Sequence, residues 1–92
     1  MELKNNAYFL GKDRVLDICE QFGTPLYVYE SERINAQYKK LKKAFSGANV
    51  KFKYACKALS NVNILKLLRT AGAGLDTVSI QEVELGLLAG YE

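Results

Sequence analysis

Strand-like and helix-like segments alternate along most of this 92-residue chain. The segments at 26–29, 50–57 and 74–78 have the length and residue pattern of strands, and each is followed by apolar residues at helical spacing. Strands that alternate with helices in this way pair in parallel through crossover helices. The chain is therefore predicted to fold as an α/β protein with about three βα units.

Capping and stop residues give the expected ends of the helices. A serine precedes each of the three helical segments of the alternating pattern and can accept a hydrogen bond from the first turn, while a glycine beyond the last turn can end two of them. Ser79 and Glu82 have the spacing of a capping box. The expected caps are Ser31, Ser60 and Ser79, and the expected stops are Gly72 and Gly90.

The first part of the chain predicts one short strand and one helix. Residues 7–10 can form the strand, and Asp13 can cap a helix that ends at Gly23. Thr24 and Pro25 then interrupt the chain before the first strand of the alternating pattern.

Composition excludes several classes of function. The net charge of +3 comes largely from lysines such as those in 39–43, which fall on the solvated face of an amphipathic helix, so no nucleic-acid partner is expected. Cys19 and Cys56 lack the spacing of a metal site or a disulfide framework, which predicts reduced thiols and no metal. No apolar run approaches membrane-spanning length and no signal peptide is evident, so a cytoplasmic location is expected.

Lys57 stands where the second predicted strand ends. Alternation sends Tyr54 and Cys56 to one face of the strand and Ala55 and Lys57 to the other. A lysine at the carboxyl end of a barrel strand, partly removed from water, can present a neutral amine that condenses with an aldehyde, and a small alanine beside it leaves room for a ring. The same position also suits an ordinary lysine that reaches solvent. The strand pattern leaves both interpretations open.

Three segments resemble motifs of the fold-type III pyridoxal-phosphate enzymes. Residues 54–58, Tyr-Ala-Cys-Lys-Ala, resemble the Tyr-Ala-x-Lys-Ala-Asn signature, in which the lysine bears the cofactor. The segments TPLYVY at 24–29 and GAGLDTVS at 72–79 are similar to the versions found in diaminopimelate decarboxylases. The resemblance covers nearly the whole chain in the same order.

This resemblance implies a fold, a cofactor and a reaction. Residues 12–92 would be the amino-terminal portion of a (β/α)8 TIM-like barrel that binds pyridoxal 5'-phosphate. Residues 1–11 would be an arm whose strand joins a separate β domain and has no partner within this chain. The implied reaction is decarboxylation of the amino acid meso-diaminopimelate to L-lysine by a full-length homodimer, with the isolated fragment inactive and prone to associate.

The resemblance also assigns roles to individual residues. Lys57 matches the cofactor lysine, and Asp76 matches an acidic residue near it at the end of the third strand, which makes both catalytic candidates. Ala55 would border the cofactor. Glu82 matches a glutamate near the active site, although the capping box accounts for it equally. Leu59 departs from the signature, which usually has asparagine there, so polar contacts near the cofactor would differ.

Other functions stay open on the sequence alone. Ornithine decarboxylase, arginine decarboxylase and alanine racemase share the implied fold and lysine. A non-catalytic pyridoxal-phosphate carrier would use the lysine without turning over an amino acid. A basic module that binds an acidic partner would not need Lys57 at all.

Overall fold

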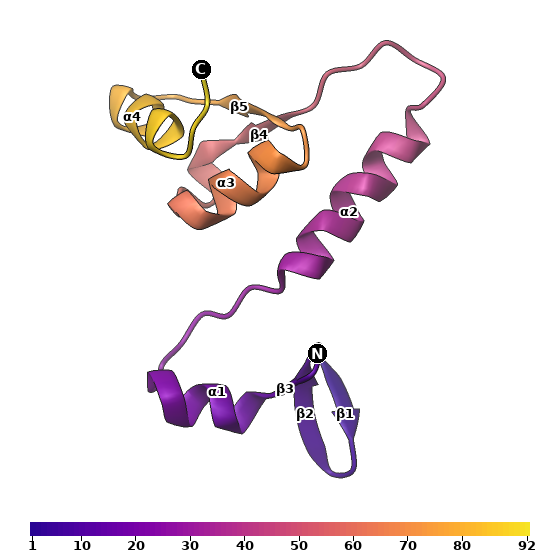
Figure 1. Cartoon of the computed structure of the whole chain (residues 1–92), viewed down its shortest axis with the longest axis vertical. Helices are drawn as coiled ribbons and strands as arrows, with labels where there is room; N and C mark the ends of the chain where they lie inside the picture. Colours follow the sequence, from indigo (N-terminus) through magenta and orange to yellow (C-terminus); the bar gives the residue numbers. More distant parts are fainter. The chain divides into compact units, whose positions relative to one another are not determined.

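Two separate units make up the chain. The computed structural model describes all residues from 1 to 92, of which residues 1–31 form the amino-terminal unit and residues 32–92 form the carboxyl-terminal unit. The first unit contains a small sheet and one helix, and the second contains two paired strands and three helices (Figure 1). None of the helices combines the length and the hydropathy needed to cross a bilayer.

Strand β2 (Ala7–Leu10) is the middle strand of an antiparallel sheet in the amino-terminal unit. It pairs with β1 (Glu2–Lys4) on one side and with β3 (Asp13–Arg14) on the other. Asn5 and Asn6 have φ values of 48° and 59°, which permit the tight hairpin turn between β1 and β2. The predicted strand at 7–10 is confirmed. The expectation that it has no partner is wrong, because the residues on both sides of it also form strands.

Helix α1 (Val15–Phe22) follows β3 directly. It ends at the predicted stop Gly23, which has a φ of 81° and donates its N–H to the last turn. Asp13 does not cap this helix, because its pairing with Leu10 holds it in the sheet. The residue before the helix is Arg14, whose side chain makes no capping hydrogen bond.

The predicted strand at 26–29 does not form. No other strand pairs with this segment, and Tyr27 is 89% exposed. Aromatic and β-branched residues favour a strand only when a neighbouring strand accepts and donates the backbone hydrogen bonds. Helix α2 (Ser31–Ala44) therefore has no strand before it, and Ser31, the expected cap, is its first residue.

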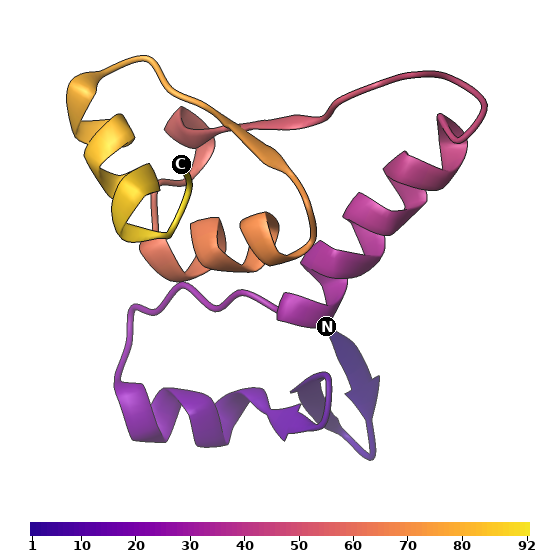
Figure 2. The same cartoon turned by 45° about the horizontal axis from the view of Figure 1, so that its top comes forward.

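Two strands and a crossover helix form the centre of the carboxyl-terminal unit. Strand β4 (Lys53–Ala55) leads through helix α3 (Val62–Thr70) to β5 (Gly74–Asp76), and β4 pairs with β5 in parallel. Figure 2 shows helix α3, in orange, below the two strands that it connects. Helix α4 (Ile80–Leu88) follows β5. The α/β class and the parallel pairing are confirmed. The register partners are Lys53 with Gly74, Tyr54 with Leu75, and Ala55 with Asp76.

The ends of α3 and α4 follow the prediction except at one cap. Asn61, rather than Ser60, caps α3: its side-chain oxygen accepts a hydrogen bond of 2.9 Å from the N–H of Asn63. The helix begins at the next residue, so Ser60 lies one position too early. Gly72 and Gly90 follow the two helices with φ values of 92°, which confirms both stops.

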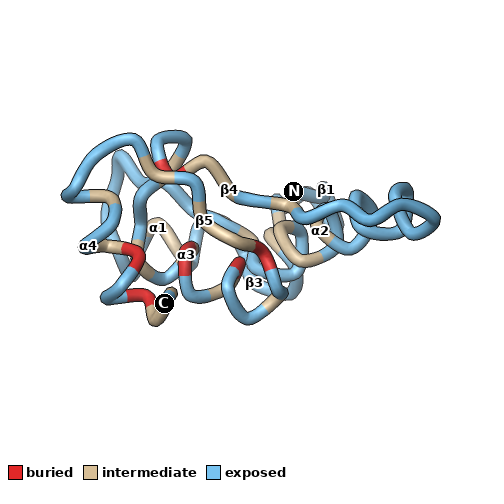
Figure 3. Tube along the Cα trace, turned by 90° about the horizontal axis from the view of Figure 1, so that it is seen from above, coloured by how far each residue is buried: buried red, intermediate tan, exposed pale blue.

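All buried residues of the chain lie between positions 56 and 89 (Figure 3). Cys56, Leu65 and Ala89 form the core cluster. Gly86 is buried where α4 approaches β5, and a Cβ atom there would come within 2.6 Å of Leu75 Cδ2. A side chain at position 86 would therefore have to displace the side chain of Leu75. The partly buried residues against the cluster are Tyr54, Val62, Leu75, Leu85 and Tyr91.

Candidate active site

Lys57 lies in a single 3-10 turn, η1 (Cys56–Ala58), that directly follows β4. The predicted strand at 50–57 is therefore too long. Its pairing stops at Ala55, whose partner is the last residue of β5. The alternation of the strand thus does not set the direction of Lys57. The side chain is exposed, contrary to the expectation that it is partly removed from water, because the turn carries it beyond the packed strand.

Ala55 and Asp76 are opposed at the carboxyl ends of β4 and β5. Opposed residues on neighbouring strands have backbones about 4.8 Å apart. Lys57 follows Ala55 by two residues, so the structure brings these three residues to one end of the sheet, as predicted. Lys57 and Asp76 are both exposed, and neither takes part in an ion pair. Both residues lie at the same end of the sheet, but no salt bridge joins them.

Glu82 fixes the segment between Asp76 and helix α4. Its Oε2 accepts a hydrogen bond of 2.7 Å from the N–H of Val78, and its own N–H donates to Ser79 Oγ at 3.2 Å. This confirms the predicted capping box, with the carboxylate reaching one residue further upstream than the usual pattern. Glu82 therefore has a structural role in this chain, and its contact with a cofactor stays a prediction.

The buried thiol of Cys56 lies directly before Lys57. Burial raises the pKa of this thiol, and the negative charge of Glu82 raises it further. A raised pKa lowers the fraction of thiolate, which is the nucleophilic form. We expect iodoacetamide to alkylate Cys56 at least about tenfold more slowly than the half-buried Cys19 in the folded protein. Mass spectrometry after graded labelling measures the order, and earlier labelling of Cys56 would contradict this account.

Tyr54 contributes to the site in a way that the sequence pattern did not predict. It packs against the core cluster. Its hydroxyl also donates a hydrogen bond of 3.1 Å to the carbonyl of Leu59, just beyond the turn that carries Lys57. Only the residue type pointed to this contact. A half-buried tyrosine usually finds a hydrogen-bond partner for its hydroxyl, and phenylalanine has no hydroxyl.

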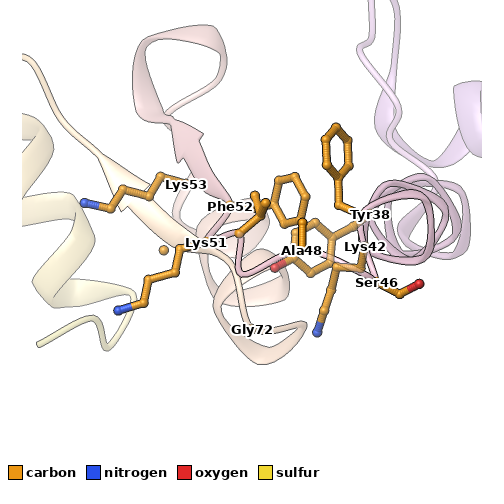
Figure 4. A pocket seen from close by; sticks show the side chains of 11 residues that line it. Tyr38, Lys42, Ser46, Ala48, Lys51, Phe52, Lys53 and Gly72 are labelled. Atoms are coloured by element: carbon orange, nitrogen blue, oxygen red, sulfur yellow. The ribbon is translucent and has the colours of Figure 1, made fainter.

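A separate pocket of about 420 Å³ lies near the start of β4 (Figure 4). Neither Lys57 nor Asp76 lines it. Three of its residues are lysines. Figure 4 shows the side chains of Lys51 and Lys53 extending to the same side and that of Lys42 pointing another way, so the three amino groups do not converge on one point. The labelled lining residues are Tyr38, Lys42, Ser46, Ala48, Lys51, Phe52, Lys53 and Gly72.

Residues 31–92 match a family model described as pyridoxal-dependent decarboxylase, pyridoxal binding domain. The chain belongs to this family. For a pyridoxal-dependent decarboxylase the turn after β4 has the appropriate chemistry, because Lys57 is an exposed primary amine without a salt-bridge partner. Ala55 is small, and Asp76 supplies a carboxylate at the same edge. These residues fit a cofactor whose aldehyde condenses with an amine.

Several relatives of this chain are named diaminopimelate decarboxylases. The enzyme of Methanothermobacter thermautotrophicus is 38% identical over 100% of this chain and 22% of its own length. That of Pseudomonas aeruginosa is 45% identical over 79% of this chain and 18% of its own length. The chain thus spans about one fifth of the length of the curated relatives it matches.

A solved structure agrees with these relatives. Diaminopimelate decarboxylase from M. jannaschii, determined in co-complex with L-lysine, matches with a TM-score of 0.91 and 34% identity, over 96% of this chain and 22% of that one. The chain therefore has the fold of the corresponding part of a diaminopimelate decarboxylase, which confirms the expected fold family.

Proposed function

We propose that this chain provides the cofactor lysine, Lys57, of a diaminopimelate decarboxylase that converts meso-diaminopimelate to L-lysine and carbon dioxide. One observation carries the proposal: an exposed amine lies just past the carboxyl end of a parallel strand, beside Ala55 and Asp76, in a chain of the pyridoxal-dependent decarboxylase family. The names of the relatives and the L-lysine held by the M. jannaschii enzyme support this choice of substrate.

The residues of the site have two roles, which are attachment of the cofactor and stabilisation of positive charge. Bound pyridoxal phosphate supplies an electron sink for the bond that breaks. Lys57 Nζ, in its neutral form, would be the nucleophile that holds the cofactor covalently. The carboxylate of Asp76 stabilises positive charge that develops near this nitrogen. The methyl group of Ala55 keeps the space beside the amine open.

The proposal extends to the domains and the assembly. Residues 12–92 form part of the barrel, and residues 1–11 join a separate β domain. The exposed side chains of Leu3 and Tyr8 support the second assignment, since a further sheet would cover them. The proposed state is a cytoplasmic homodimer with no nucleic-acid partner. Light scattering of the full-length protein tests the dimer, and a monomer at all concentrations would contradict it.

Product analysis tests the proposed reaction. The full-length protein with pyridoxal phosphate should release L-lysine and carbon dioxide in equal amounts from meso-diaminopimelate. Ornithine, arginine and alanine serve as competing substrates. Faster turnover of one of these amino acids would assign the protein to another enzyme class of this fold. Cofactor binding without turnover of any amino acid would indicate a carrier.

Replacing Asp76 with asparagine should separate charge from size at this position. The amide keeps the shape of the side chain but removes the negative charge that stabilises a cation near Lys57. We expect the kcat of the full-length enzyme to fall by about tenfold to a hundredfold. Glu84→Gln, an exposed neutralisation on helix α4, is the control and should leave kcat unchanged. Equal changes of kcat in the two variants would show that Asp76 has no specific role in the reaction.

A further inference from the structure

Two hydrogen bonds close the turn that carries Lys57. The N–H of Leu59 donates to the carbonyl of Cys56 at 3.2 Å, which is the turn's own bond. The hydroxyl of Tyr54 donates to the carbonyl of Leu59 at 3.1 Å and reaches across the turn from inside β4. Lys57 therefore lies between two points of backbone that are joined to each other and to a neighbouring side chain.

Tyr54 is a firm anchor for this contact. It is the middle residue of β4, with Leu75 as its register partner on β5. Its ring packs against the cluster that contains the fully buried Cys56 and Leu65. The position of the ring is thus set by the sheet and the core, while Lys57 on the turn is exposed. The hydrogen bond from the Tyr54 hydroxyl to Leu59 therefore ties the turn to the core.

We propose that Tyr54 is a positioning residue, whose hydroxyl holds the Lys57 turn in place at the carboxyl end of β4. The proposal rests on the proposed function, in which Lys57 is the cofactor lysine. A phenylalanine ring would pack in the same way but would leave the carbonyl of Leu59 without this donor. The turn would then shift or open, and a misplacement of about 1 Å at a reacting group can cost about a hundredfold in rate.

Tyr91 offers a matched control. It packs against the same core cluster, it is also half-buried, and its hydroxyl donates to a backbone carbonyl, that of Leu65, at 3.4 Å. Its partner lies in helix α3 and not in the turn of Lys57. Tyr54→Phe and Tyr91→Phe therefore each remove one hydroxyl from the same core, and only the first acts on the turn.

Hydrogen exchange of the full-length protein without cofactor tests the contact itself. We expect Tyr54→Phe to speed exchange of the Leu59 amide by about fivefold to tenfold, because that amide closes the turn. Tyr91→Phe should leave this amide unchanged. Unchanged exchange in Tyr54→Phe, or an equal increase in both variants, would overturn the proposal.

The rate of cofactor capture tests the consequence. Pyridoxal phosphate is added to each variant, and the growth of visible absorbance is followed together with the borohydride-trapped label on Lys57. Tyr54→Phe should slow capture by about tenfold, and Tyr91→Phe should stay within about twofold of wild type. Equal rates in the two variants would contradict a positioning role. Absence of label on Lys57 in the wild type would instead refute the proposed function, while the exchange measurement still decides whether Tyr54 holds the turn.

Discussion

Replacing Lys57 with alanine is expected to abolish covalent capture of pyridoxal phosphate and to lower decarboxylation by about 10³-fold or more, the scale observed when a covalent nucleophile is removed. The amine is the only part of the side chain that can bond to the aldehyde, and alanine offers no replacement. The side chain is exposed, so its removal should leave the stability of the fold nearly unchanged. Visible absorbance after addition of the cofactor and steady-state kinetics measure the two effects.

Lys66→Ala is the control for this substitution. Lys66 is an exposed lysine on helix α3 with no ion pair, so its loss changes the net charge equally. It should leave both the absorbance band and the activity intact. A Lys57→Ala variant that still develops the band would show that another amine holds the cofactor.

Replacing Leu65 with alanine should cause the largest loss of stability. Leu65 is 0% exposed and packs with Cys56 and Ala89 in the core cluster. Truncation removes buried apolar contact and leaves a cavity, which typically costs about 2–5 kcal/mol of unfolding free energy. Because Cys56 begins the turn of Lys57, cofactor capture should weaken as well. Chemical denaturation monitored by circular dichroism measures the change.

Leu87→Ala provides the comparison for stability. Leu87 lies on helix α4 and is 59% exposed, so the same truncation removes little buried area. The expected change is within about 0.5 kcal/mol. A similar loss in the two variants would contradict the location of the core between helices α3 and α4 and the two strands.

Local patterns predicted the centre of the carboxyl-terminal unit well. The parallel pairing of β4 and β5 follows from the alternation of strands with helices, and it brings Ala55 and Asp76 opposite each other. The capping box of Ser79 and Glu82 and the glycines after α3 and α4 depend on neighbours within a few residues, so the sequence contains all the information they need.

The features that the sequence did not predict depend on contacts between distant residues. The segment 26–29 has strand-forming residues but no strand to pair with. The pairing of β4 ends at Ala55 because β5 ends at Asp76, and this leaves Lys57 in a turn. The hydrogen bond from Tyr54 to Leu59 depends on that turn, so it could not be foreseen from a continuous strand. The partners of β2 were missed because β1 and β3 are too short to stand out by composition.

Borohydride reduction of the full-length protein with bound pyridoxal phosphate, followed by peptide mapping, identifies the residue that holds the cofactor. Reduction makes the bond between the cofactor and its amine permanent, so the labelled residue can be identified by mass. We expect a single label on the peptide that contains Tyr54 to Ala58, at Lys57 Nζ. A label on any other lysine would contradict this expectation.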